Sequence, residues 1–444
     1  MTTGRFNVPS RESNSMSMKP NWQKIGDLIS SRILIELALV GSFLAFSLNP
    51  GSIGDLMRIC GAIFLANLFI GKYRLTDLTM GHMVMLTVFL FVLLINLFMP
   101  GEMVHDRSLS YFLAFPGAVL ACHLLAVKLR NRPLKELPWL CLAALLLAVL
   151  TQFIVYLILK GGTTYGVYSN LHHLGLFSSL TIPLLIYFFI QFQGWIRVPL
   201  VMIVLFDFYL LWDSSSRISW LSFFAGTLFT FLAFLRKKQL VIGLAALILL
   251  SSSAAYFSGF SHISSRLQDF ADNWQTEERV YFWSDTLALL KKNSIPDWLL
   301  GHGIGSFRYY FAEYAGLTIK KYNMTINYPH NVFLQIIFEN GIIGFTLIFG
   351  TLFYLPLASW KGFKRLGSQQ ERGLLIVCFA VFWIDLIHCF LNKSLYSKYI
   401  LYSLSVIVGM SLVLLEKAGQ NKSWQAWRTG PASAIPPLPS KPHR

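Results

Sequence analysis

Cationic and titratable side chains recur at the ends of apolar segments in this 444-residue chain. Arginine binds phosphate through a planar fork of N–H donors, and a neutral histidine can accept a proton near neutral pH. Side chains of these types at one depth of a membrane suit an anionic lipid head group. The candidates are Lys160, His172, His173, Asp213, Arg217, His330 and Asn331.

Arg217 follows three serines, at 214–216, and leads directly into the apolar run 218–235. A guanidinium in that position can bind a phosphate group at the membrane surface. Two other roles stay open on the local sequence alone. Arg217 can anchor a helix end at the interface, or it can pair with Asp213 four residues earlier.

His330 lies in the segment Tyr328-Pro329-His330-Asn331. Pro329 disfavours helix directly before it and can occupy the first turn of the helix that follows. His330 is therefore expected at the outer mouth of a helix. An unperturbed histidine has a pKa of about 6.5, so its neutral ring can act as a general base. An ordinary interfacial or core histidine is the alternative.

Several catalytic motifs are absent from the sequence. It contains no Asp-x-Asp and no His-Glu-x-x-His motif, and the glycines of Gly301–Gly305 are not followed by the Lys-Ser/Thr of a phosphate loop. The five cysteines all lie in apolar stretches and lack the spacing of zinc ligands. We therefore expect no metal site and no cofactor, which weakens the case for a metal-dependent sugar-nucleotide transferase.

The composition indicates which elements must position these residues. Hydrophobic residues make up 55% of the chain and charged residues only 13%, whereas soluble domains carry roughly 25% charged residues. A soluble enzyme and a disordered chain are both excluded on this basis. The apolar residues form long blocks, which predict twelve membrane-spanning helices. They lie near 32–49, 53–71, 82–99, 110–127, 139–158, 174–192, 197–212, 217–235, 239–257, 331–357, 374–392 and 397–415.

The basic residues predict the orientation of these helices. The net charge of +16 comes from Lys and Arg in the gaps between apolar blocks rather than on one face, so we do not expect a nucleic-acid partner. Basic residues in alternate short gaps outnumber those in the other gaps by about four to one. This bias places both termini in the cytoplasm and the long segment 258–330 on the outer side.

Five regions follow from this topology. They are a cytoplasmic segment 1–31, nine helices in 32–257, an outer loop 258–330 with catalytic elements, three helices in 331–415, and a Pro-rich cytoplasmic tail 416–444. Within the loop, apolar residues at helical spacing predict an amphipathic helix over 278–292. Pro296 and the glycines of Gly301–Gly305 are expected to end it, and a second amphipathic piece is expected over 306–317.

The stretch His330–Gly344 resembles the most recognisable segment of the O-antigen ligase and polymerase superfamily, in which His-Asn is followed by Glu-x-Gly and a later glycine. Residues 278–283 and 299–307 are similar to the Arg-x-x-x-Trp helix and the Gly-x-Gly-x-x-Phe turn of that family. Ser216–Trp220 resembles its Ser-Arg motif. The resemblance covers about residues 214–350.

The resemblance implies a polytopic glycosyltransferase of the bacterial inner membrane with its site facing the periplasm. The donor would be a glycan on undecaprenyl pyrophosphate, and the acceptor of a ligase would be lipid A–core. Arg217 and Arg279 would hold the pyrophosphate in place of a divalent metal, and His330 would be the general base of an inverting displacement. Asn331 would orient His330 or bind sugar. Further contacts to phosphate or acceptor would come from Lys160, His172, His173 and Arg266.

Three other functions remain open. An O-antigen polymerase of the same superfamily uses the same donor but a lipid-linked acceptor. A protein O-oligosaccharyltransferase usually carries a larger C-terminal soluble domain than the residues 416–444 found here. A transporter or flippase would place ionisable residues at mid-membrane around a cavity. The deeper ionisable residues are expected instead to pair inside the bundle; they are Glu36, His123, Asp207, Asp385 and His388.

Overall fold

The computed structural model describes most of the C-terminal two thirds of the chain and parts of the rest. The described residues are 53–70, 80–97, 171–214, 216–234, 278–314 and 326–429, with short pieces at 78, 109, 112, 114–120, 145–152, 154–155, 316 and 318. Within them every regular element is a helix and no strand occurs. The predicted all-α class is therefore confirmed for this part of the chain.

Six of the described helices are long and apolar enough to cross a membrane, so the protein is a multi-pass membrane protein. They are α7 (Leu171–Gln191), α8 (Arg197–Asp213), α9 (Arg217–Phe234), α16 (Val332–Phe363), α17 (Gln369–Leu391) and α18 (Lys398–Thr429). The helices α3 (Ile53–Phe69) and α4 (Met80–Leu97) are also apolar, but their searched stretches, Met57–Phe69 and Gly81–Leu97, are shorter than the six candidate spans, of which the one that includes α8 begins at Gly194. The other four predicted spans lie wholly or partly outside the described residues, and the count of twelve stays a prediction.

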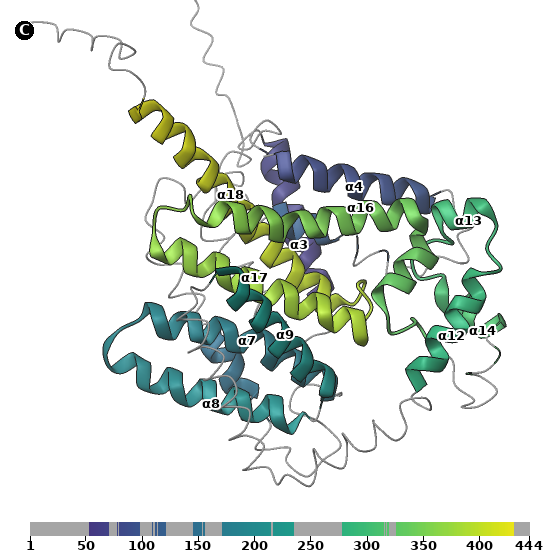
Figure 1. Cartoon of the computed structure of the whole chain (residues 1–444), viewed down its shortest axis with the longest axis horizontal. Helices are drawn as coiled ribbons and strands as arrows, with labels where there is room; N and C mark the ends of the chain where they lie inside the picture. Colours follow the sequence, from purple (N-terminus) through teal and green to yellow (C-terminus); the bar gives the residue numbers. More distant parts are fainter. Residues whose placement is uncertain are drawn as a thin grey trace, which may run out of the picture.

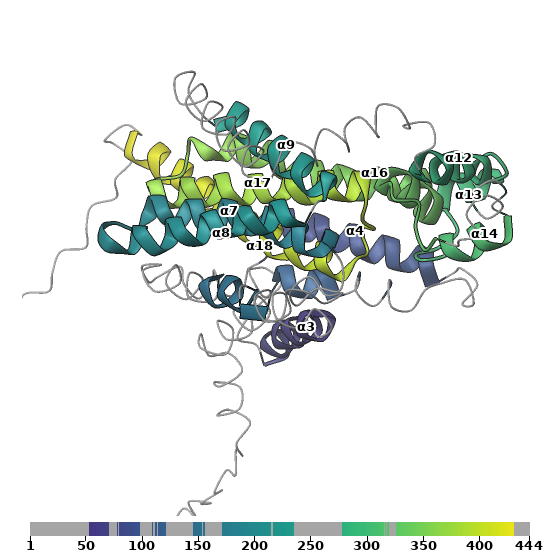
Figure 2. The same ribbon diagram turned by 90° about the horizontal axis from the view of Figure 1, so that it is seen from below.

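Helix α17 lies at the centre of the bundle and contacts α7, α9, α16 and α18. Helix α8 pairs with α7 at one edge of the bundle, and α4 lies against α16 at the opposite edge (Figure 1). Figure 2 shows α3 on one side of the bundle, where it contacts α18. Helices from both sides of α17 in the sequence thus pack against it.

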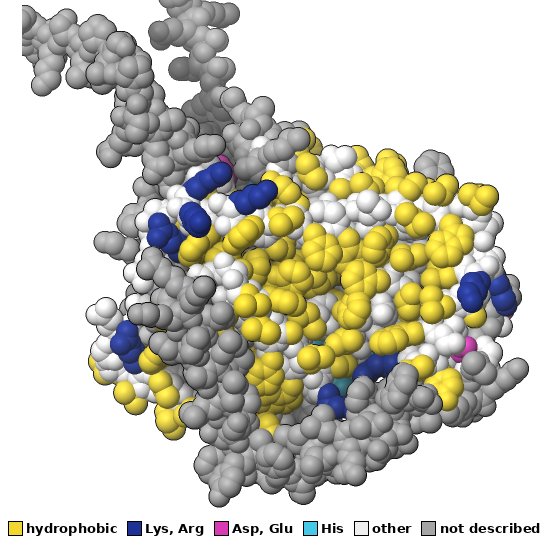
Figure 3. Space-filling view, viewed as in Figure 1, with side chains coloured by type: hydrophobic (Ala, Val, Ile, Leu, Met, Phe, Trp, Pro, Cys, Tyr) yellow, Lys and Arg dark blue, Asp and Glu magenta, His cyan; other side chains and the backbone are white. Residues whose placement is uncertain are grey.

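The surface of the bundle is apolar over a broad area (Figure 3). Hydrophobic side chains cover the middle of the face shown, and Lys and Arg gather around its edges. Large apolar side chains such as Met202 and Leu205 of α8 and Tyr354 and Leu357 of α16 are exposed. A continuous exposed apolar area of this kind is unfavourable in water and natural in lipid.

Three short helices form a cap at one end of the bundle (Figures 1 and 2): α12 (Glu278–Leu290), α13 (Ile295–Leu300) and α14 (Phe307–Tyr314). We call this region, residues 278–314, the cap. Its apolar cluster joins Phe282, Phe307 and Phe311 to Phe338 of α16. The helices predicted over 278–292 and within 306–317 are both present.

The expectation for Pro296 was wrong. Pro296 does not end a helix but stands in the first turn of α13, where the missing N–H costs nothing. Ser294 and Asp297 form a reciprocal capping box around it: the Asp297 N–H donates to Ser294 Oγ, and the Ser294 N–H donates to Asp297 Oδ2 at 3.0 Å. The sequence signal for this helix start, Ser-x-x-Asp, was present and was overlooked.

Helix α16 is kinked at Gly341, which has φ +63° and ψ −175°. The kink leaves carbonyl groups of the preceding turn without helical partners. The Phe338 carbonyl accepts from the His302 N–H at 3.0 Å, and the Glu339 carbonyl accepts from the Gly303 N–H at 2.8 Å. N–H groups of the glycine turn in the cap thus donate to the carbonyl groups of α16 that the kink leaves without helical partners. The glycine turn and the Glu-Asn-Gly of α16 therefore form one hydrogen-bonded unit.

Side chains complete this unit. The buried Glu339 carboxyl accepts from the Phe307 N–H at 3.4 Å and from Gln335 Nε2 at 3.3 Å. Asn96 of α4 accepts from the Ile304 N–H at 2.6 Å. These contacts tie the cap to two helices of the bundle, so the Glu of the motif has a structural role here.

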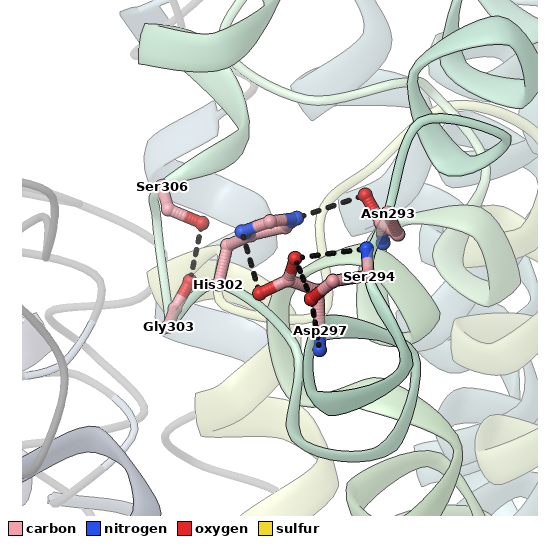
Figure 4. A network of polar contacts seen from close by, with 6 residues as sticks. All are labelled: Asn293, Ser294, Asp297, His302, Gly303 and Ser306. Carbon is pink, nitrogen blue, oxygen red and sulfur yellow. Dashed lines mark hydrogen bonds and ion pairs between the residues drawn. The ribbon is translucent and has the colours of Figure 1, made fainter.

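His302 connects the glycine turn to the start of α13 (Figure 4). Its Nε2 donates to Asn293 Oδ1 at 3.0 Å, and its Nδ1 lies 3.8 Å from Asp297 Oδ1. Burial lowers the pKa of His302, while the nearby Asp297 raises it. On the other side of the turn, Ser306 Oγ donates to the Gly303 carbonyl at 2.7 Å.

The last helix is longer than expected. Apolar patterning predicted an end at residue 415, but α18 continues to Thr429. Helix α16 likewise ends at Phe363 rather than at 357. Hydropathy registers where apolar side chains stop, and a helix can continue past that point among polar residues. The Pro-rich residues 430–444 lie outside the described part of the chain.

The kink generates a first prediction. Gly341→Ala places a Cβ against the Leu299 carbonyl and forces a side chain into a conformation that is nearly exclusive to glycine. We expect a loss of roughly 3 kcal/mol or more in stability, seen as a lower unfolding temperature of the detergent-purified protein. Gly350→Ala in the same helix, where the Cβ meets nothing within 4 Å, is the control and should be neutral or stabilising. Equal unfolding temperatures for the two variants would contradict this account of the kink.

Candidate active site

The starts of four helices and one turn bring the candidate residues together. His172 begins α7, Arg217 begins α9, Arg279 lies in the first turn of α12, and His330 precedes α16. The turn between α17 and α18 adds Lys393. Four positively charged or titratable groups act electrostatically on His172; they are Lys393, Arg279, His330 and Arg217. Residues that lie far apart in the sequence thus share one site.

The hydrogen bond of His330 indicates its tautomer. Its Nδ1 lies 2.9 Å from the Asn392 backbone carbonyl and 3.3 Å from Asn392 Oδ1. Because a carbonyl oxygen can only accept, Nδ1 carries the hydrogen in this bond. In a neutral imidazole the other nitrogen, Nε2, then has a free lone pair. This is the protonation state that a general base requires.

The backbone around His330 is unusual. His330 has φ +53°, and within the described residues it is the only non-glycine residue with a positive φ. Asn331 is extended and caps α16: its Oδ1 accepts from the N–H groups of Phe333 at 3.0 Å and Leu334 at 3.2 Å. The cap fixes the point at which the helix begins, and so it holds His330 at the helix mouth. Left-handed backbone of this kind is frequently found at functional sites.

The surroundings of His330 favour its neutral form. Its ring lies 5.5 Å from Phe282 and 4.6 Å from Tyr328, measured between centroids. Burial is the largest influence and lowers the pKa of His330 to about 4. The Asn392 backbone carbonyl raises that pKa, and the positive charges of Arg279 and Lys393 lower it. Arg279 therefore lies close enough to act on the imidazole.

A chain of hydroxyl groups connects two further histidines. His172 Nδ1 is 3.0 Å from Ser216 Oγ, and Ser219 Oγ donates to Ser216 Oγ at 2.9 Å. Ser219 Oγ is also 3.2 Å from His388 Nε2. The chain links the starts of α7 and α9 to the last turn of α17.

Other deep ionisable groups pair inside the bundle, as expected. Asp207 accepts from the Thr181 hydroxyl, and Asp385 accepts from the Ser403 hydroxyl. Both carboxyl groups are fully buried. Glu36 and His123, which were grouped with them, lie outside the described residues.

Sequence reasoning missed two residues of the site, Asn392 and Lys393. Lys393 is 7% exposed, and its Nζ lies 2.8 Å from His173 Nε2. The His173 ring also packs on Tyr399, with 4.3 Å between centroids. Lys393 was counted only among the basic residues of the outer side. Its place in a short outer turn, at the depth of the other candidates, was the signal that could have found it.

Of the remaining candidates, two arginines lie in the described part of the chain and two residues lie outside it. Arg217 is exposed and Arg279 is half-buried. Lys160 and Arg266 lie outside the described residues. Among the residues that the structure does describe, no group of three or more His, Cys, Asp or Glu is arranged to hold a metal ion.

The fold and the site thus define a class of protein: a helical membrane protein that carries an imidazole and several cations at one end of its bundle. Residues 200–349 match the model of a family described as O-antigen ligase. The match runs from α8 into α16 and includes Arg217, Arg279 and His330. Residues 200–349 thus carry the domain of this family, which supports the superfamily that the motifs predicted. A comparison with curated proteins finds none that matches.

The family match indicates the function in general terms. The family includes glycosyltransferase-like O-antigen ligases, and it implies lipid-linked polysaccharide substrates in a membrane. At this coarse level, the match supports an enzyme of this general kind.

The environment of His330 generates a second prediction, on pH and stability. A folded-state pKa of about 4, below the unfolded value of about 6.5, means that the unfolded chain binds more protons between these two values. The stability contributed by the neutral ring is present above pH 6.5 and is lost as the pH falls towards 4. One pKa unit corresponds to about 1.4 kcal/mol, so the loss is at most a few kcal/mol.

His330→Asn tests this prediction, because asparagine tolerates the left-handed backbone but does not titrate. We expect the unfolding temperature of the wild type to fall more than that of His330→Asn when the pH is lowered from 7 to 4.5. The other titrating groups are common to both proteins and cancel in the comparison. Identical pH dependence of the two proteins would show that the environment of His330 does not favour the neutral ring.

Proposed function

We propose that the protein is an O-antigen ligase of the bacterial inner membrane. It transfers O-antigen polysaccharide en bloc from undecaprenyl pyrophosphate to lipid A–core on the periplasmic side, and both of its termini are cytoplasmic. The observation that carries the proposal is the His330 imidazole, whose Nε2 is free to accept a proton beside the cations Arg279 and Lys393. His330 and Arg279 lie within the region that matches the ligase family, whereas Asn392 and Lys393 follow it in the sequence.

The proposed reaction is a single displacement at the anomeric carbon. The acceptor oxygen forms a bond to that carbon, the bond from the carbon to the diphosphate oxygen breaks, and the configuration inverts. His330 Nε2 takes the proton from the acceptor hydroxyl, a contribution of typically about 10²–10⁴-fold in rate. The diphosphate leaves as an anion, so it needs neutralisation by Arg217 and Arg279 more than it needs a proton.

An apolar cavity in the bundle supports the proposal that the donor carries a lipid. A cavity of about 430 Å³ lies between α4, α16 and α18 and is lined by residues such as Val88, Thr351 and Leu404. Leu395, which also lines it, belongs to the same turn as Asn392. A polyprenyl tail in this cavity would bring its head group towards His330.

The same cavity weighs against a transporter. A polar substrate crossing the membrane needs charged or polar groups along its path. Among the described residues, the lining of this cavity contains no carboxylate, ammonium, guanidinium or imidazole group. It suits a hydrocarbon chain and not a sugar.

The acceptor would approach from the side of the cap, which lies beside His330 through Phe282. In this proposal Asn331 orients His330 through its helix cap. His172 and His173 are assigned to phosphate or acceptor contacts, together with Lys160 and Arg266. The segment 258–330, which contains the cap, would cover the site from the periplasm.

Substitutions test the catalytic assignment. We expect His330→Asn, Arg217→Ala and Arg279→Ala each to insert normally into the membrane and to reduce O-antigen attachment by at least about 10²-fold. Attachment is read from lipopolysaccharide gels of a deletion strain that carries each variant. Arg365→Ala, an exposed arginine after the far end of α16, is the control and should attach O-antigen normally. Attachment at the wild-type level in any of the three variants would remove that residue from the mechanism.

The same strain separates ligase from polymerase. Loss of a ligase leaves lipid A–core without O-antigen while long lipid-linked polymer accumulates. Loss of a polymerase leaves core that carries a single repeat. In a membrane assay, transfer by the ligase should survive EDTA, because arginines neutralise the diphosphate. A strict requirement for added divalent metal would overturn the arginine assignment.

A further inference from the structure

Within the part of the chain that the structure describes, Lys393 is a buried ammonium group without an anionic partner. It is 7% exposed, and its Nζ contacts His173 Nε2 at 2.8 Å. Among the described residues, no carboxylate lies within ion-pair distance of Lys393. An ammonium group removed from water costs folding free energy unless a partner supplies negative charge. The protein therefore keeps a destabilising buried charge at position 393.

The neighbours of Lys393 do not offset its charge. The Lys393 ammonium and the Arg279 guanidinium both act electrostatically on His330, and the same two groups act on His388. His172 lies within reach of both of these cations and of Arg217. Cations that lie this close together raise one another's electrostatic energy in a site of low polarity. An arrangement of this kind is favourable once a multiply charged anion occupies it.

The contact with His173 fixes where the ammonium points. Nζ can only donate while it is protonated, so His173 Nε2 accepts, and two N–H groups of Lys393 remain for other oxygens. Burial lowers the pKa of Lys393 to about 8, so that the group is still mostly charged near pH 7. The adjacent residue, Asn392, holds His330 through its carbonyl. One turn of chain therefore places both the base and an ammonium group.

We propose that Lys393 is a direct ligand of the donor diphosphate, that it acts beside Arg217 and Arg279, and that His173 positions its ammonium group. The inference rests on the proposed function and adds a third cation to its anion site. It assigns a structural reason to the turn Asn392-Lys393-Ser394, which sequence reasoning left without a role.

The proposal has a consequence that a structural role would not share. Lys393→Met keeps the length of the side chain and removes the buried charge. The empty protein should therefore unfold at an equal or higher temperature, while its affinity for a diphosphate lipid falls. A lysine that merely supports the fold would give the opposite result, a lower unfolding temperature with unchanged affinity.

The experiment uses the full-length protein in lipid nanodiscs. Affinities for undecaprenyl pyrophosphate and for undecaprenol are measured for the wild type, Lys393→Met, Lys393→Arg and Lys364→Met. Lys364 is an exposed lysine that follows α16 and serves as the control. We expect Lys393→Met to weaken undecaprenyl pyrophosphate binding by about ten- to hundredfold, as for the loss of a charge-assisted hydrogen bond, with undecaprenol unaffected. Lys393→Arg should retain most of the affinity, and Lys364→Met all of it.

Undiminished affinity in Lys393→Met would overturn the proposal. If the wild type itself binds undecaprenyl pyrophosphate no better than undecaprenol, the proposed donor fails instead, so the two failures are distinguishable.

Discussion

The hydrogen bond from His330 Nδ1 to the Asn392 carbonyl is the contact on which the site depends. It joins the start of α16 to the turn after α17, and it selects the tautomer that leaves Nε2 as an acceptor. The acceptor is a backbone carbonyl, so the bond does not depend on the side chain at position 392. The left-handed backbone of His330 and the Asn331 cap bring the imidazole to that carbonyl. Without this bond, the ring would have no fixed orientation towards a substrate.

The cations around this imidazole show how the site balances stability against binding. Lys393 and Arg279 both disfavour a protonated His330, so the base stays neutral while the site is empty. A bound diphosphate would compensate these charges and let the imidazole hold the proton that it takes from the acceptor. In the proposed mechanism, the donor would therefore bind before the base becomes effective. The serine chain between His172 and His388 keeps the helices that carry these groups in place.

Much of this architecture could be predicted from local patterns, because a helix start or an amphipathic face is encoded by neighbouring residues. The cap helix at 278, the start of α16 after Asn331 and the clustering of titratable residues at helix ends are of this kind. Features that depend on distant contacts could not. The kink at Gly341 requires the Leu299 carbonyl and the glycine turn, and the burial of Lys393 requires His173, 220 residues away in the sequence. The Pro296 helix start is a different case, because its capping signal was local and was overlooked.

The first turns of α16 contribute residues to two apolar clusters, one in the core of the bundle and one in the cap. Val332 and Ile336 face the core of the bundle, whereas Leu334 and Phe338 pack with the cap. A change in the apolar cluster of the cap therefore acts on the helix that begins directly after His330 and Asn331. Tyr309 of the cap and Asn327 are exposed, line an open hollow and lie outside the apolar cluster that the cap shares with α16. Diversity among relatives should concentrate there, while the interior of the cap changes slowly.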